Sequence, residues 1–96
     1  DSPFIWRDAE SGCLLMLWSS FSRLSGNYAI GQLTSTSGKV EGPWVQVSVP
    51  VYDNGGHQML FYDLDGNLKM SFHYNNNDAH LRIVDVKIVD GKVQLK

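Results

Sequence analysis

Apolar residues occur in short runs along the whole chain, and their spacing has the two-residue period of β-strands rather than the period of a helix. Cys13–Trp18 is apolar at every position, a pattern typical of a strand that is covered on both faces. Val45–Val49 and Leu68–Phe72 alternate between apolar and polar residues, as half-exposed strands do. Asp90-Gly91 predicts a type I′ hairpin turn. The pattern therefore predicts an all-β chain.

We expect four antiparallel strands in each half of the chain, separated by clusters of turn-forming residues. In the first half they are Pro3–Arg7, Cys13–Trp18, Tyr28 to about Ser35, and Val45–Val49, with a polar loop at Ser19–Asn27. In the second half they are Met59–Tyr62, Leu68 to His73, Arg82–Val89 and Lys92–Leu95, with a loop at Asn75–Asp78.

The two halves also resemble each other as sequences. Phe4-Ile5-Trp6 aligns with Leu60-Phe61-Tyr62 at an offset of 56 residues, and Gly12 to Trp18 aligns with Gly66 to Phe72 at an offset of 54. Repeats of roughly 40–50 residues with four strands each are typical of β-propeller blades. We therefore interpret residues 1–52 as one blade and 53–96 as the next. From the pattern alone, a sandwich of two unrelated hairpins remains open.

A propeller closes around its axis with about four to eight blades, whereas this chain of 96 residues supplies two. An isolated pair of blades would leave two apolar faces in water. We expect the chain to be one piece of a longer protein, and to self-associate or dissolve poorly when it is isolated. Its partners would be the remaining blades or copies of itself.

Composition narrows the classes of partner. The net charge is −2 and the Lys and Arg residues are scattered, so neither nucleic acid nor a membrane surface is expected as a partner. No apolar run is long enough to span a bilayer. Cys13 is the only cysteine, which excludes an internal disulfide.

Several motifs in order are similar to a stretch of glycoside hydrolase family 43. They are Asp1–Arg7, Gly12–Phe21, Tyr28–Gly31, Gly42–Trp44 and Gly55–Phe61. The resemblance implies a five-bladed propeller of which this chain forms the C-terminal two blades, the fourth and the fifth. It also implies cleavage of xylan- or arabinan-type glycosides with inversion, by an acid and a base carboxyl group.

By the same resemblance, Asp1 stands at the place of the general acid, which opens an inner strand in a carboxylate-Gly-Pro-like motif. The chain departs from that motif twice, with Asp1 where Glu is usual and Ser2 where Gly is usual. His57, after Gly55-Gly56, matches a channel histidine that supports a bound ion, often calcium, or water. No residue is expected to bind a metal directly and no cofactor is expected in this piece alone. The equal offset of Asp1 and His57 predicts that the two lie close together.

Other residues have simpler interpretations. Trp6, Trp18 and Trp44 are more often core residues than sugar-stacking platforms. Asp63–Gly66 resembles the start of a calcium loop but lacks the later Glu, so a hairpin turn explains it better. His73 and His80 have no metal-ligand spacing with His57, which argues against a zinc site.

The sequence thus favours part of a secreted or periplasmic glycoside hydrolase that binds carbohydrate and is inactive as this piece alone. The rival hypothesis is a non-catalytic carbohydrate-binding or self-assembling propeller module. The base and the third family carboxylate have no counterpart in this chain, which is why the piece alone is expected to be inactive.

Overall fold

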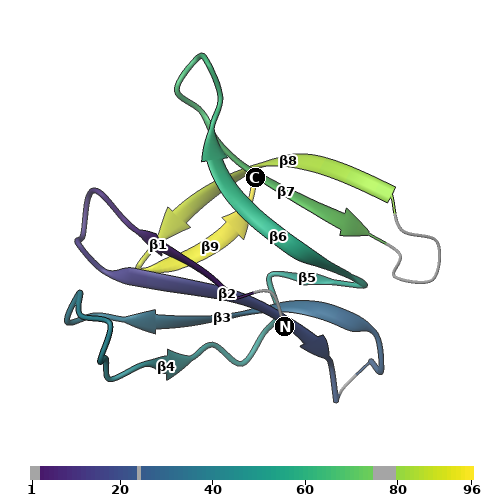
Figure 1. Cartoon of the computed structure of the whole chain (residues 1–96), viewed down its shortest axis with the longest axis horizontal. Coiled ribbons are helices and arrows are strands. Elements are labelled where there is room, and N and C mark those ends of the chain that lie inside the picture. Colours follow the sequence, from purple (N-terminus) through teal and green to yellow (C-terminus); the bar gives the residue numbers. More distant parts are fainter. Residues whose placement is uncertain (1–2, 24, 75–79) are drawn as a thin grey trace.

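The computed structural model describes residues 3–23, 25–74 and 80–96. All regular structure in these ranges is β, and it forms two antiparallel sheets (Figure 1). This confirms the all-β prediction and the division into two blade-like sheets. No helix in the described ranges is long and apolar enough to cross a membrane.

The first sheet has the order β1-β2-β3-β4, with β5 also paired to β3. Its strands are β1 (Phe4–Arg7), β2 (Leu14–Phe21), β3 (Tyr28–Ser35), β4 (Val45–Gln46) and β5 (Tyr52–Asp53). The register pairs Phe4 with Leu17 and Phe21 with Tyr28.

This sheet has five strands rather than the four expected, because its outer strand is divided into β4 and β5. The prediction of one strand over Val45–Val49 is wrong beyond Gln46. The backbone stays beside β3, since Val47 and Val51 donate their N–H groups to carbonyls of that strand. Pro50 has no N–H to donate, so the ladder is interrupted before β5 begins.

The second sheet has the order β6-β7-β8-β9 and four strands, as predicted. They are β6 (Gly55–Tyr62), β7 (Leu68–Tyr74), β8 (His80–Val89) and β9 (Lys92–Leu95). The turn into β9 has positive φ at both Asp90 (52°) and Gly91 (73°), as a type I′ turn requires. The change from one sheet to the other falls at Asn54, and the division into blades at residues 52 and 53 stays a prediction.

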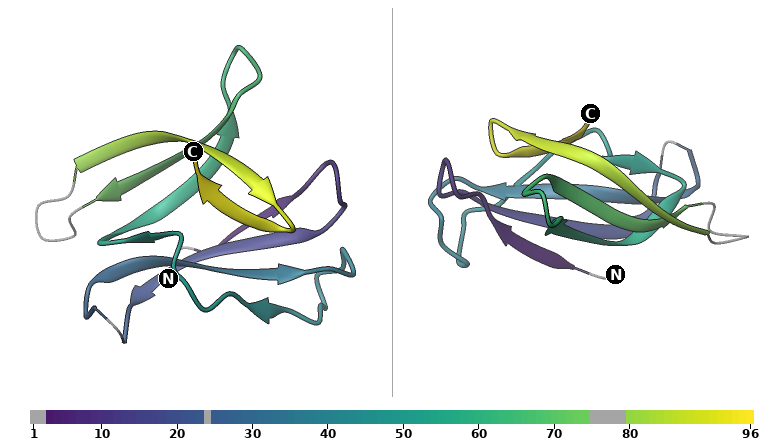
Figure 2. Two further views of the ribbon diagram at one scale, coloured as in Figure 1. Left: turned by 180° about the vertical axis from the view of Figure 1, so that it is seen from behind. Right: turned by 90° about the horizontal axis from the view of Figure 1, so that it is seen from above.

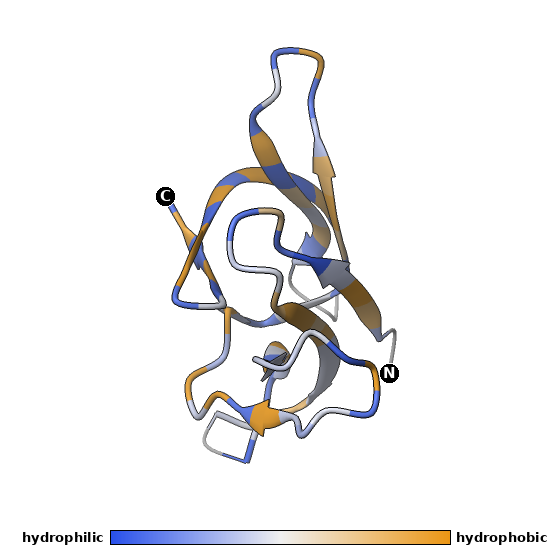
Figure 3. Ribbon diagram, turned by 90° about the vertical axis from the view of Figure 1, so that its left-hand side faces the viewer, coloured by the Kyte–Doolittle hydropathy of each residue, from blue (hydrophilic) through white to orange (hydrophobic). Residues whose placement is uncertain are grey.

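The core lies between the two sheets, which pack side by side (Figure 2). Figure 3 shows hydrophobic and hydrophilic bands alternating along the strands. Because every second residue of a strand points to the same face, such alternation lets one face of each sheet supply apolar side chains to the core. The first sheet contributes Leu15, Leu17 and Ile30, and the second contributes Leu60, Met70, Phe72, Val86 and Val93, all buried.

The far faces of the sheets are less covered. In β2, Leu15 and Leu17 are fully buried, whereas Met16 and Trp18 on the opposite face are only partly buried. A groove of about 600 Å³ adjoins Trp18 on that face. On the second sheet, Met59, Leu81 and Ile83 are more than half exposed. The continuous apolar pattern of β2 thus has one face in the core and one that the chain covers only in part.

Candidate functional site

Four strand ends meet at one end of the two sheets, on the right in Figure 1. Phe21 ends β2 opposite Tyr28, which begins β3. Gly55 begins β6 opposite Tyr74, which ends β7. His57, the expected channel histidine, lies at this end, near the start of β6 as predicted.

His57 occupies a β-bulge. The β6–β7 register shifts between Gly56 and Met59, so His57 and Gln58 together lie opposite one residue of β7. The φ angle of His57 is +52°, in the left-handed region that residues other than glycine adopt infrequently. Bulges of this kind redirect a side chain, and here the imidazole becomes solvent-exposed. Backbone strain of this kind persists only where surrounding contacts hold it.

The two glycines before His57 let β6 pass between two tyrosine rings of the first sheet. A Cβ on Gly55 would lie 3.0 Å from the Tyr52 ring, and one on Gly56 would lie 2.3 Å from the Tyr28 ring. Successive side chains of a strand point to opposite faces, so the two rings lie on opposite sides of the backbone. The glycines are therefore needed for close contact between the sheets.

Ser19 connects the first sheet to the bulge. Its side chain is fully buried, and its hydroxyl donates to Gln58 Oε1 at 2.6 Å. The backbone N–H of His57 donates to the same hydroxyl oxygen, with N and Oγ 3.2 Å apart. Both bulge residues are thus hydrogen-bonded to one serine of β2.

Aromatic rings lie beside the imidazole of His57. The centroid of His73 is 4.7 Å from that of His57 and 6.1 Å from that of Tyr28. The rings of His73 and Tyr28 are nearly parallel, at 5°. Nε2 of His73 is buried and has no hydrogen-bond partner in the described part of the chain. Three rings from three strands therefore support this end of the site.

Asp1, the expected general acid, lies outside the described residues, so its proximity to His57 stays a prediction. The described start of β1 is Phe4, which pairs with Leu17 near the end of β2. Ser19 follows two residues later on β2 and bonds to His57. The beginning of β1 and His57 are thus at the same end of the first sheet.

The described side chains do not form a metal site of their own. No group of three or more His, Cys, Asp or Glu residues converges in the described ranges. Calcium takes six to eight oxygen ligands, whereas this end offers an imidazole together with hydroxyl and amide oxygens that already accept or donate hydrogen bonds. An ion near His57 would need oxygen ligands from elsewhere.

Sequence reasoning missed two residues of this site, Ser19 and His73. The sequence predicts a polar loop at Ser19, but β2 continues to Phe21 and Ser19 is buried. His73 has no metal-ligand spacing with His57 along the chain, yet the hairpin brings the two rings together. The turn at Asp63–Gly66 fixes the β6–β7 register, and extending that register to its end would have indicated the pair.

The three tryptophans take up separate positions. Trp6 packs between Phe4 and Tyr62, with centroid distances of 6.1 and 5.6 Å. Trp44 donates its indole N–H to the carbonyl oxygen of Val40. Trp18 lines the groove on the outer face of the first sheet.

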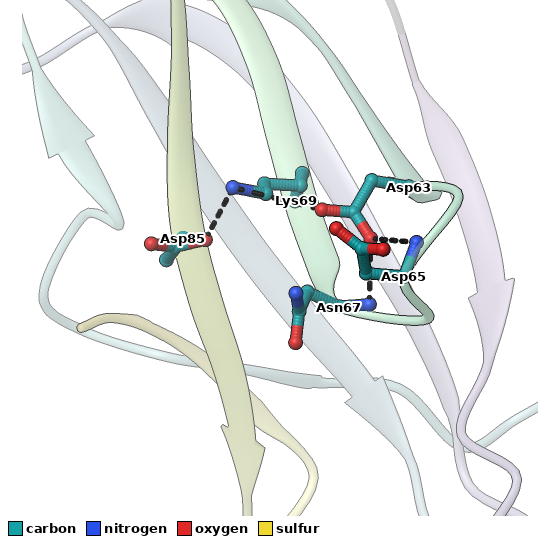
Figure 4. Close-up of polar contacts among 5 residues, drawn as sticks. All are labelled: Asp63, Asp65, Asn67, Lys69 and Asp85. Atoms are coloured by element: carbon teal, nitrogen blue, oxygen red, sulfur yellow. Dashed lines mark hydrogen bonds and ion pairs between the residues drawn. The ribbon is translucent and has the colours of Figure 1, made fainter.

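The Asp63 turn is a hairpin, as expected. A carboxylate oxygen of Asp63 accepts the N–H groups of Asp65 and Asn67, at 3.0 and 2.9 Å (Figure 4). These bonds, that from Asn67 first, hold the pKa of Asp63 below its ordinary value. Lys69 Nζ lies 2.7 Å from Asp85 and 3.8 Å from Asp63, and the bond to Asp85 raises the pKa of Lys69. The carboxylates are thus engaged in turn and strand contacts.

The fold matches a solved endo-arabinase from Bacteroides thetaiotaomicron VPI-5482 with a TM-score of 0.91 and 49% identity, over 96% of this chain and 33% of that one. A thermostable family-43 glycoside hydrolase matches with a TM-score of 0.80 and 22% identity, over 100% and 35% of the two chains. The resemblance to family-43 glycoside hydrolases is confirmed.

An endo-1,4-beta-xylanase, also from Bacteroides thetaiotaomicron VPI-5482, matches with a TM-score of 0.79 and 24% identity, over 100% of this chain and 37% of that one. This xylanase and the thermostable family-43 hydrolase are 24% and 22% identical to the chain, and at such identities the likeness shows the fold alone. No protein-family model matches the sequence. No curated protein matches it either. The family-43-like chain spans about a third of the length of the solved structures that it matches.

Proposed function

We propose that this chain supplies two blades of a glycoside hydrolase that cleaves arabinan-type linkages. The observation that carries the proposal is the 49% identity to an endo-arabinase over nearly the whole chain, with a TM-score of 0.91. The likeness to an endo-1,4-beta-xylanase has half that identity and supports the fold, so arabinan takes precedence over xylan.

In this proposal the mechanism is inverting and needs two carboxyl groups. A protonated acid donates its proton to the glycosidic oxygen while a carboxylate base activates a water on the opposite face of the sugar. Asp1 would be the acid, because it matches in sequence the position at which the family's acid opens an inner strand. The base would come from a blade that precedes this chain, as would the carboxylate that tunes the acid.

His57 would orient water, or an ion held by oxygen ligands of other blades, at the axial end of the channel. A calcium ion there would act electrostatically on the nearby carboxylates. The support is the strained bulge, the exposed imidazole and the hydroxyl of Ser19 that holds the backbone of the same residue. Such strain is concentrated at functional sites.

A second candidate is a non-catalytic carbohydrate-binding or self-assembling module. Two residues favour it: Asp1 is one methylene shorter than the Glu usual in the acid motif, and Ser2 replaces the usual Gly. A shorter acid that does not reach the glycosidic oxygen would leave binding intact and remove hydrolysis.

A chimera separates the two candidates. The third of the endo-arabinase that corresponds to this chain is replaced by residues 1–96, and hydrolysis of debranched arabinan is measured. We expect turnover, loss of at least about 100-fold with Asp1→Asn, and full or higher activity with Asp1→Glu, because positioned acid catalysis contributes about 10²–10⁴-fold. NMR identifies which anomer of the product is released first, and this tests whether the reaction inverts the configuration at the anomeric carbon.

A folded chimera that binds arabinan without hydrolysing it, and that gains hydrolysis with Asp1→Glu, supports the module. A folded chimera that is active and insensitive to Asp1→Asn contradicts the role of Asp1. Asp53→Asn is the matched control, since Asp53 is an exposed carboxylate of β5 that the mechanism does not use.

A further inference from the structure

We propose that Ser19 is the positioning residue of His57, so that a serine of the first sheet sets the place of a histidine of the second. The inference rests on the proposed role of His57. It concerns a residue that touches neither substrate nor ion, and that acts through the backbone of the bulge.

The hydroxyl of Ser19 makes one donor and one acceptor contact with the bulge. A serine hydroxyl has one hydrogen to donate and two lone pairs that accept. A hydroxyl that donates to Gln58 Oε1 can also accept the N–H of His57 on an oxygen lone pair, so the two distances, 2.6 and 3.2 Å, are mutually consistent. One side chain therefore binds the side chain of one bulge residue and the backbone of the other.

Burial makes these contacts hard to replace. Ser19 has no solvent exposure and Gln58 has 4%. Water is therefore excluded from Ser19 Oγ, and loss of the hydroxyl would remove one hydrogen-bond partner from the Gln58 side chain and one from the His57 N–H. Both bulge residues would bear a part of the cost.

The space around the hydroxyl is fitted to glycine at position 56. A Cβ on Gly56 would lie 3.0 Å from Ser19 Oγ and 2.3 Å from the Tyr28 ring. The close approach of β6 thus brings the His57 N–H within reach of Ser19. Without that hydrogen bond, the left-handed conformation of His57 would lose a contact that compensates its strain.

The contact links the two sheets at the end where β1 begins. Ser19 lies on β2, which pairs with β1, whereas His57 lies on β6. The position of the histidine relative to the strand that follows Asp1 is therefore set inside this chain. In a closed propeller, Ser19 would transmit the position of one blade to the channel residue of the next.

The test is amide hydrogen exchange by NMR on the isotope-labelled chimera of the endo-arabinase with residues 1–96, carrying Ser19→Ala. We expect the His57 amide to exchange about ten-fold faster relative to the amides of Met70 and Phe72, as for loss of one hydrogen bond. The ring resonances of His57 should shift as well. Ser35→Ala is the matched control, because Ser35 is also fully buried, its hydroxyl donates to the Lys39 carbonyl, and it lies at the other end of β3.

Ser19→Cys keeps the volume with a weaker acceptor, and it decides the question if Ser19→Ala does not fold. An accelerated His57 amide in either Ser19 variant, with Ser35→Ala unchanged, supports the proposal. Unchanged His57 exchange and ring shifts in the folded Ser19 variants overturn it. Exchange does not depend on catalysis. An inactive chimera in which the Ser19 variants still accelerate exchange of the His57 amide would therefore contradict the proposed function and support the positioning role.

Discussion

The side chain of Gln32 forms two hydrogen bonds with the backbone of Val93. Its Nε2 donates to the Val93 carbonyl oxygen at 3.2 Å, and its Oε1 accepts the Val93 N–H at 2.8 Å. Gln32 belongs to β3 and Val93 to β9, so a side-chain amide takes the place of a neighbouring strand. Thr34 adds a third bond, from its hydroxyl to the Gly91 carbonyl at 2.8 Å.

Gln32→Ala should lower the free energy of unfolding by about 2 kcal/mol, because it leaves the N–H and C=O of Val93 buried without their partners. Urea unfolding of the chain measures this. Gln94→Ala is the control, since Gln94 is an exposed glutamine of β9 beside Val93, and should change the value by less than about 0.5 kcal/mol. Equal effects of the two substitutions would contradict the stated role of Gln32.

Gly56→Ala should destabilise the chain by about 1–3 kcal/mol, because the added Cβ would lie 2.3 Å from the Tyr28 ring. In a Tyr28→Leu background the same substitution should cost less, since the ring that it meets is gone. A double-mutant cycle of urea unfolding measures the difference. An additive cycle would show that the tyrosine is not the obstacle.

The isolated chain should self-associate through its uncovered sheet faces. Met59, Ile83 and Leu81 are 52%, 54% and 76% exposed on one face of the second sheet. Sedimentation velocity should show larger species, and Met59→Glu with Ile83→Lys should reduce them. Leu64→Lys is the control, because Leu64 is fully exposed at a hairpin tip. A compact monomer at high concentration would favour an independent two-sheet domain.

The isolated chain should not hydrolyse aryl arabinofuranosides or xylosides, since an acid without its base leaves the inverting mechanism incomplete. Release of the aryl group is compared with a heat-inactivated control. Turnover well above that control and abolished by Asp1→Ala would refute this expectation.

The turn contacts of Asp63 and Lys69 should appear as opposite pH dependences of stability. The pKa of Asp63 is lowered from 3.8, so its contribution is present above pH 3.8 and lost as pH falls below it. The pKa of Lys69 is raised from 10.5, so its contribution is present below pH 10.5 and lost as pH rises above it. Unfolding of Asp63→Asn and Lys69→Met against the parent across both ranges measures each loss. A difference that stays constant across its range would contradict the assignment.

The local pattern of apolar, polar and turn-forming residues is sufficient to predict the strands whose pairing is continuous. Tyr28 to Ser35 has the bounds expected, and the Asp90-Gly91 turn has the dihedral angles that its sequence requires. The local pattern is not sufficient where tertiary contacts determine how far a strand extends. The alternation of Val45–Val49 predicted one strand, but Val45 and Val49 are both exposed and the ladder breaks before Pro50.

The candidate site, too, could be predicted from the sequence only in part. The position of His57 followed from the repeat and from the resemblance, whereas its φ of +52° depends on a bulge that no local pattern announced. Ser19 resembles any serine of a polar loop until the second sheet covers it. The ring of His73 becomes the neighbour of the His57 ring only through the β6–β7 hairpin.

The bonds from Gln32 and Thr34 bear on aggregation. The outer edge of β9 would otherwise present free N–H and C=O groups, a template for adding a foreign strand. Side chains of β3 already occupy the Val93 N–H and the carbonyls of Val93 and Gly91. A foreign strand that adds to the second sheet along β9 would therefore first have to displace these side chains of β3, which protects this edge against sheet extension.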